Sequence, residues 1–215
     1  SIKYVIKMTN KPYTISKSEY LTGLYCPKAL WLQRNRKDLL GEPDIGSQYR
    51  FDVGKDIGEK IKEYLGSGFE SKLKHYDIEK AAEETFEKIE KGCKLIYEGT
   101  AIHSRSKAYA RADVLIGDKD DQWELIEVKS STGKKPYHID DLSFQYMVFK
   151  NNGLNIKSIS VMHLNKIYAL EKNIKNISLF KKSDVTKEVT ERQIQTEDMS
   201  QRIINKCFSK EAPIV

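Results

Sequence analysis

The stretch WELIEVKSSTG, from Trp123 to Gly133, places two charged side chains at the end of a strand-like run. Its first six residues have the apolar and β-branched character of a buried strand. Side chains alternate between the two faces of a strand, so Leu125, Glu127 and Lys129 share one face. A charged group inside such a strand is costly unless a partner compensates it. We therefore expect a compensating group beside Glu127 and Lys129.

The surrounding sequence predicts three more strands and a crossover helix. The strands are KLIYEGTAI (94–102), AYARADVLI (108–116) and SISVMHLNK (158–166), and the helix is YHIDDLSFQYMVFKNNG (137–153). Gly117 and the aspartates after it favour a turn, so the first three strands form an antiparallel meander. The helix then allows the last strand to run parallel to one of them. The chain is thus predicted to have an α/β fold with a mixed sheet.

The regions that flank this core are predicted to be mainly helical. Helices are expected at 14–37, 51–66, 77–92 and 185–208. In the first, Ser16 or Ser18 caps the start and Pro27 kinks or splits the segment. Glycines stop the second and the third. Residues 168–173 and 178–185 are expected to form a hairpin. We divide the chain into an N-terminal helical region (1–92), a core (93–185) and a C-terminal helix (186–215).

Composition and charge restrict the class of protein. The chain has 215 residues and a formal net charge of +6, which favours polyanionic partners such as nucleic acid. Its three cysteines are far apart and odd in number, which argues against a secreted disulfide framework. No signal-peptide pattern opens the chain, and no apolar run approaches the roughly 20 residues of a membrane span. We expect a cytoplasmic protein without a membrane segment.

A pair of carboxylates is the main candidate site. Antiparallel pairing through the Gly117 turn brings Asp113, a charge in the apolar run RADVLI, close to Glu127. Two hard oxygen ligands suit Mg²⁺ or Mn²⁺, and Lys129 beside them can act on the attacking water or on transition-state charge. This is the equipment of metal-assisted phosphodiester hydrolysis. The alternative is an ordinary strand-end ion pair, with Asp113 flanking the turn.

These motifs resemble the RecB-like branch of the PD-(D/E)XK nuclease superfamily, whose fold is restriction-endonuclease-like. In that branch an Asp ends one strand, E-x-K follows on the next, and a helix carries Q-x-x-x-Y. Here Asp113, Glu127, Lys129 and Gln145 match, and Phe149 replaces the Tyr. SKSEYLTGLYCPKALWL, LIYEGTAI, DDLSFQYMV and HLNKIY extend the likeness to a bacterial family similar to CRISPR-associated RecB-like nucleases.

The resemblance implies an activity and a set of roles. It implies a Mg²⁺- or Mn²⁺-dependent deoxyribonuclease that acts as an exonuclease; endonuclease action and the preference for single or double strands stay open. Asp113, Glu127 and the Val128 carbonyl are the implied metal ligands. Lys129 is the implied catalytic lysine, and Gln145 positions it or the ligands.

The sequence departs from the branch at two places. The branch often has a metal-binding His on an early helix, where this chain has Gly58; Glu98, a charge in an apolar strand, is the best substitute ligand. Related nucleases also hold a [4Fe–4S] cluster with one upstream and three late cysteines. Cys26 matches the upstream one, but only Cys207 lies late. We therefore expect Cys26 to be a free thiol in this chain, and a cluster only if a longer chain supplies further cysteines.

Three further residues are candidate nucleic-acid contacts, and two alternative functions stay open. Lys134, Lys135 and Tyr137 follow the E-x-K strand and are candidates for contacts to a DNA backbone or base, although a solvated loop is an equally good interpretation. The missing His leaves open a catalytically degenerate protein that binds nucleic acid without cutting it. An adaptor in a repair or defence assembly is the remaining alternative.

Overall fold

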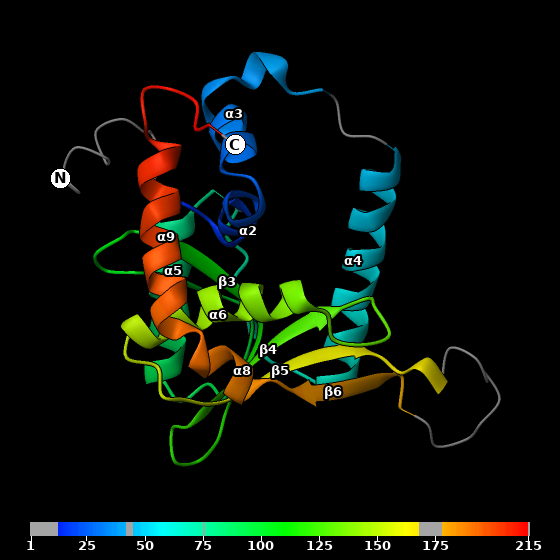
Figure 1. Ribbon diagram of the computed structural model, residues 1–215. Helices are drawn as coiled ribbons and strands as arrows, with labels where there is room; N and C mark the ends of the chain where they lie inside the picture. The colour runs from blue at the N-terminus through cyan, green and yellow to red at the C-terminus, as the bar shows by residue number, and fades with distance from the viewer. Residues whose placement is uncertain (1–12, 42–44, 75, 168–177, 215) are drawn as a thin grey trace.

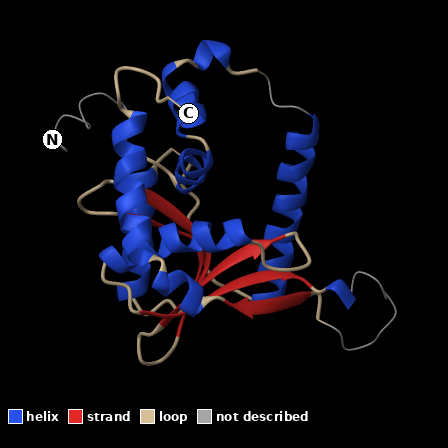
Figure 2. Cartoon of the chain, in the orientation of Figure 1, coloured by secondary structure: helices blue, strands red, loops and turns tan. Residues whose placement is uncertain are grey.

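The structure is a computed structural model that describes residues 13–41, 45–74, 76–167 and 178–214 (Figure 1). Its centre is a six-stranded mixed sheet in which the strands are adjacent in sequence order. The strands are β1 (Phe69–Glu70), β2 (Leu95–Ile102), β3 (Tyr109–Gly117), β4 (Trp123–Lys129), β5 (Ile156–Leu164) and β6 (Phe180–Asp184). Figure 2 shows the sheet with helices on both sides.

The pairing of the strands confirms the predicted core. Strands β2, β3 and β4 form the antiparallel meander. Helix α6 (Pro136–Asn151) then crosses over, and β5 pairs parallel with β4. β6 pairs antiparallel with β5, and β1 pairs parallel with β2. The fold is therefore the predicted α/β class with a mixed sheet.

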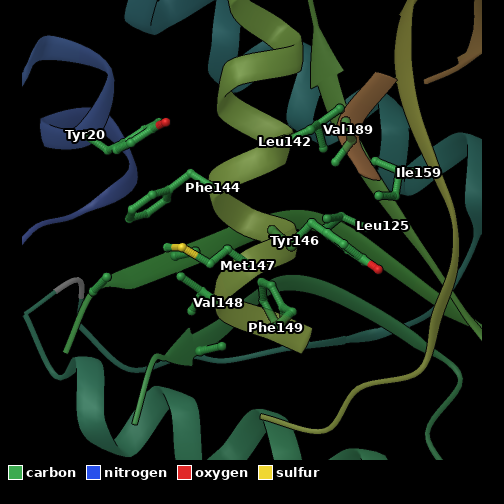
Figure 3. Packing of buried hydrophobic residues seen from close by; sticks show 14 of the residues in the cluster. Tyr20, Leu125, Leu142, Phe144, Tyr146, Met147, Val148, Phe149, Ile159 and Val189 are labelled. Carbon is green, nitrogen blue, oxygen red and sulfur yellow. The ribbon is translucent and has the colours of Figure 1, made fainter. Parts of the chain in front are cut away.

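Two apolar clusters hold the helices to opposite faces of the sheet. One cluster joins α6 to the sheet and to α2 (Lys17–Tyr25), α3 (Pro27–Asn35), α8 (Thr186–Glu191) and α9 (Gln193–Cys207). Figure 3 shows its centre, where Phe144 and Phe149 of α6 are buried. In the other cluster Ile57 and Ile61 of α4 (Ile45–Leu65) pack on Ile126 and its neighbours. Helix α5 (Ile78–Glu90) packs on β2, and Lys37–Leu39 form a short 3₁₀ helix.

The helix boundaries follow the signals in the sequence. Ser16 caps α2 in a capping box with Glu19, and Pro27 splits the predicted segment by starting α3. Cys26 is the cap of α3, where its Sγ accepts a hydrogen bond from the Ala29 N–H at 3.4 Å. Glycines at 66, 92 and 153 follow α4, α5 and α6, each with a positive φ, as their predicted role as helix stops requires.

The structure differs from the sequence prediction at three peripheral places. Helix α4 begins at Ile45, six residues before the predicted start. The single C-terminal helix is instead α8 and α9, which are separated at Arg192 because its N–H bonds the Val189 carbonyl three residues back. In the predicted hairpin, residues 168–173 lie outside the described ranges, and β6 pairs with β5 instead. Within the described ranges, no helix is long and apolar enough to cross a membrane.

Candidate active site

The strands β3 and β4 separate at the position of the two predicted carboxylates. Their ladder runs from Gly117 opposite Trp123 to Val114 opposite Ile126. One step further the register sets Asp113 opposite Glu127, but the backbone pairing has ended. The Val128 N–H instead donates to Asp113 Oδ2 at 2.7 Å. A side chain thus replaces a ladder bond and fixes Asp113 beside Glu127.

The alternation of side chains also breaks at this position. Ala112 and Leu115 both pack in the cluster on the α6 side, although a separation of three should place them on opposite faces. Asp113 lies between them. Opposite Asp113 on β2, Glu98 has a φ of 53°. That left-handed conformation costs about 1–2 kcal/mol for a residue with a side chain. The backbone strain therefore lies where the carboxylates meet.

Glu127 is the buried centre of a charge network. Its side chain is 1% exposed. Lys129 Nζ lies 2.5 Å from Glu127 Oε1, and Gln145 Nε2 donates to Oε2 at 2.6 Å. Lys17 Nζ lies 3.1 Å from each of the two oxygens. The compensating group that the strand required is thus two ammonium groups and an amide.

Asp141 is a second buried carboxylate of the network. Lys129 Nζ lies 3.3 Å from its Oδ2, and Lys17 Nζ lies 3.5 Å from its Oδ1. Gln145, one turn further along α6, donates to Oδ1 at 2.8 Å. Gln145 therefore holds Glu127 and Asp141 with the same amide nitrogen.

Lys17 and Asp141 were not identified from the sequence. Asp141 carries a local signal, because it precedes Gln145 by four residues and so shares its face of the helix. Lys17 carries none, because it is 110 positions from Glu127. Its place depends on the docking of α2 on α6, where the rings of Tyr20 and Phe144 stack with centroids 4.5 Å apart.

A cleft of about 850 Å³ opens in front of these groups. Its lining on the sheet side includes Glu98, Asp113, Glu127, Val128 and Lys129. Helix α4 forms part of its other wall, which includes Gly58. The two predicted carboxylates and the lysine therefore face a space large enough for a substrate group.

The pKa values of the two facing carboxylates are shifted in opposite directions. Burial opposes the charge of Glu127, but Lys17 and Lys129 outweigh burial and lower the pKa of Glu127. Burial, followed by the charge of Glu127, raises the pKa of Asp113. Burial also opposes the charge of Lys129, yet Glu127 and Asp141 raise the pKa of Lys129 above its ordinary value. Lys129 is thus a protonated donor, and the charge of Asp113 lacks full compensation.

The donor chemistry at this position fits a divalent cation. Asp113 and Glu127 offer hard carboxylate oxygens at the cleft, and a cation between them would compensate the charge that burial disfavours on Asp113. Mg²⁺ usually keeps several waters and takes only one or two protein carboxylates. Among the described residues, no group of three or more His, Cys, Asp or Glu side chains is arranged to hold a metal ion. The fit is therefore to a two-carboxylate site.

Glu98 lies in the cleft but faces Arg111. Its side chain is 45% exposed, and its Oε2 is 4.0 Å from Arg111 Nε. Burial raises the pKa of Glu98, and Arg111 opposes that effect. The structure thus brings Glu98 to the same cleft as Asp113, with a guanidinium rather than a second carboxylate as its contact.

The three predicted nucleic-acid contacts are exposed at the start of α6. Lys134 forms an ion pair with Glu188, and Lys135 lies over the ring of Tyr137 with its Nζ 5.9 Å from the centroid. None of the three is among the described residues that line the cleft. They form a separate basic and aromatic surface beside α6.

Comparison with known proteins gives weak likenesses. Neither a family profile nor a curated protein sequence matches this chain. The structure is similar to an alkaline exonuclease, LHK-Exo, from Laribacter hongkongensis, with 12% identity over 96% of this chain and 92% of that chain and a TM-score of 0.42. A structure of LHK-Exo in complex with dAMP gives 11% identity over 90% and 87% and a TM-score of 0.48. The description of the site therefore depends on the contacts among this chain's own residues, and not on these similar structures.

Proposed function

We propose that this chain is a metal-dependent deoxyribonuclease of the RecB-like PD-(D/E)XK type. One observation carries the proposal: Asp113 and Glu127 stand opposite each other where β3 and β4 separate, and Lys129 is in contact with Glu127 at the same cleft. Two carboxylates and a lysine at a solvent-filled cleft are suited to phosphodiester hydrolysis. Their order along the chain is also that of the family motif.

The residues take distinct roles in this proposal. Asp113, Glu127 and the Val128 carbonyl would hold Mg²⁺ or Mn²⁺, with Glu98 as a further ligand. When bound, the cation would polarise the phosphodiester and lower the pKa of an attacking water. Lys129 presents a protonated ammonium group to the charge that develops on the phosphate oxygens. This role agrees better with its two carboxylate contacts than that of a general base.

Gln145 and Asp141 position the reacting groups. Gln145 fixes the orientation of the Glu127 carboxylate through its 2.6 Å hydrogen bond. Asp141 also holds Lys129, whose Nζ donates to its Oδ2 at 3.3 Å. A lysine held by two carboxylates loses little freedom during the reaction, which is what electrostatic preorganisation requires.

The proposed substrate is DNA, cut from an end, in the cytoplasm. The net charge of +6 supports a polyanionic substrate. Lys134, Lys135 and Tyr137 are the proposed contacts to the strand beyond the cleft, because they are exposed basic and aromatic side chains next to the α6 end of the site.

A catalytically degenerate nucleic-acid-binding protein is the second candidate. It is favoured by the contacts of Glu127, whose two oxygens are both occupied by side-chain donors. Gly58 in place of the family's histidine supports the same candidate. This protein would bind DNA through the same surface without hydrolysing it.

Digestion of end-labelled DNA distinguishes the two candidates. Single- and double-stranded substrates are incubated with Mg²⁺, Mn²⁺ or a chelator, and the products are separated by length. We expect metal-dependent loss of nucleotides from an end, which Glu127→Gln abolishes. Glu124→Gln is the matched control, because Glu124 lies on the same strand and contacts Ser160 and Lys182 instead. Binding without cleavage under every metal would establish the second candidate instead.

A further inference from the structure

Lys17 lies between two carboxylates that come from different elements. It is the first residue of α2, and its Nζ lies 3.1 Å from both oxygens of Glu127 on β4. The same Nζ lies 3.5 Å from Asp141 Oδ1 on α6. The Lys17 side chain is 22% exposed, whereas those of the two carboxylates are 1% and 3% exposed. Lys17 and Lys129, whose side chain is 24% exposed, are thus two partly exposed cations that contact a buried pair of carboxylates.

The hydrogen-bond capacity of Glu127 is already filled. A carboxylate has about four lone-pair sites. In the structure Glu127 Oε1 contacts Lys129 and Lys17, and Oε2 contacts Gln145 and Lys17. A cation that takes Glu127 as a ligand therefore has to displace one of these donors.

Lys17 is the donor that is easiest to displace. Its two contacts with Glu127 are longer than those of Lys129 at 2.5 Å and Gln145 at 2.6 Å. Its departure alone would free one site on each oxygen. Its ammonium group also has a second carboxylate within reach, so it need not be left as an unpaired charge.

We propose that Lys17 is an exchangeable counter-cation of the metal site, which neutralises Glu127 when no divalent cation is bound and moves to Asp141 when one binds. This inference rests on the proposed function, because it takes Glu127 as a metal ligand. It gives Asp141 a defined role as the acceptor of the displaced ammonium group. Lys17 and the cation thus compete for Glu127, and each weakens the binding of the other.

Titration calorimetry with Mn²⁺ alone, without DNA, tests the competition. Lys17→Met keeps the length of the side chain and removes its charge, so Mn²⁺ affinity should rise about tenfold. Lys17→Arg keeps a competing cation, and its affinity should stay below that of Lys17→Met. Lys182→Met is the matched control, because Lys182 pairs with Glu124 of the same strand, 2.8 Å away and outside the cleft. Its affinity should equal that of the unaltered chain.

The acceptor role of Asp141 is tested with a double-mutant cycle. Asp141→Asn should weaken Mn²⁺ binding, because the displaced ammonium group loses its second partner. The same change should have a smaller effect in the Lys17→Met background, since no ammonium group then needs an acceptor. Equal effects in the two backgrounds would show that Asp141 does not act through Lys17.

A crystal structure of the unaltered chain with Mn²⁺ tests the exchange directly and does not depend on the folding of any variant. We expect Lys17 Nζ within hydrogen-bond distance of Asp141 and no longer of Glu127. Mn²⁺ bound at Glu127 with Lys17 still in contact would overturn the exchange but leave the metal site intact. Equal Mn²⁺ affinities of Lys17→Met and the unaltered chain would have the same meaning. Absence of Mn²⁺ binding in every protein would overturn the proposed function itself.

Discussion

Asp113 accepts a hydrogen bond from the backbone N–H of Val128 at 2.7 Å, so a buried carboxylate closes the end of the β3–β4 ladder. The contact couples fold and site, because the side chain that would bind a cation also ties the two strands together. An amide at this position can keep the backbone contact while losing the charge, which separates the two roles by experiment.

Asp113→Asn is expected to abolish cleavage without loss of the fold. Asn retains an oxygen that accepts the Val128 N–H, but a neutral amide is a poor ligand for Mg²⁺. Turnover should fall by more than about a hundredfold, since even indirect support of a metal ligand is worth up to that much. The assay is metal-dependent cleavage of labelled DNA, with circular dichroism for the fold. Asp184→Asn serves as control, because Asp184 accepts a hydrogen bond from the Thr186 N–H outside the cleft. Wild-type turnover in Asp113→Asn would refute the assignment of Asp113 as a metal ligand.

The same variant is expected to be more stable than the unaltered chain at pH 8 in a chelator. Burial and Glu127 raise the pKa of Asp113 to about 8, so between about pH 4 and pH 8 the folded chain holds a proton that the unfolded chain has released. The stability that Asp113 contributes is therefore complete below pH 4 and is lost as the pH rises through 8. Asn carries no such proton, so the advantage of the variant should grow with pH.

Thermal unfolding across this pH range measures the effect, with an internal control of opposite sign. Hydrogen bonds from Thr186 lower the pKa of Asp184, so the contribution of Asp184 is present at neutral pH and is lost as the pH falls. Asp184→Asn should thus be less stable than the unaltered chain at pH 8. A pH-independent difference for Asp113→Asn would contradict the raised pKa.

Lys129→Ala is expected to lower turnover and leave DNA affinity nearly unchanged. Its ammonium group is held by Glu127 and Asp141 inside the cleft. It can therefore contact the reacting phosphate, but not the phosphates further along the DNA strand. Loss of such a placed charge costs about a hundredfold or more in turnover. Single-turnover kinetics and equilibrium binding measure the two quantities separately. Equal losses in both would identify Lys129 as a phosphate tether instead.

Lys135→Ala is expected to show the converse pattern. Lys135 is exposed beside Tyr137 and lies outside the cleft, so it should affect binding and spare the chemical step. Binding by the unaltered chain should weaken steeply with salt, and the variant should reduce the slope of log affinity against log salt by about one. Lys182→Ala gives the comparison for a lysine elsewhere on the surface. A salt-independent affinity of the unaltered chain would contradict the assignment of DNA as partner.

The sequence predicted the parts of the fold that depend on local signals. The strand periods, the crossover helix and the glycines after α4, α5 and α6 are all properties of short stretches, and the structure confirms them. The proximity of Asp113 and Glu127 also followed from a short turn and the period of a strand. The break between α8 and α9 at Arg192 did not follow from the sequence, because it depends on a backbone hydrogen-bond pattern that helix propensity does not specify.

The remainder of the site depends on tertiary packing. Lys17 lies beside Glu127 because α2 docks on α6, where Tyr20 stacks on Phe144, and no local pattern predicts that contact. The change of face at Asp113 likewise breaks the alternation that a regular strand is expected to show. Such breaks concentrate backbone strain where side chains must converge, and rules derived from regular strands do not predict them.

Gln145→Leu is expected to lower both stability and turnover, because one amide nitrogen serves Glu127 and Asp141 together. Leucine fills a similar volume but leaves two buried carboxylates without that donor, which costs about 1–3 kcal/mol in the free energy of unfolding. Turnover should fall further than stability explains, because Glu127 then loses one of the contacts that fix its orientation. Urea unfolding and single-turnover cleavage measure the two effects.

Two further variants show whether the shared hydrogen bonds cause these losses. Gln145→Glu sets a third carboxylate between Glu127 and Asp141, so its charged form should be less stable than Gln145→Leu. Burial and the two neighbours raise the pKa of the new carboxyl, and stability should recover as the pH falls through that pKa, because the protonated carboxyl can donate. Gln193→Leu removes an amide that bonds the Ser143 and Val189 carbonyls, and it should retain full turnover. If Gln145→Leu matched Gln193→Leu in both measurements, Gln145 would have no positioning role.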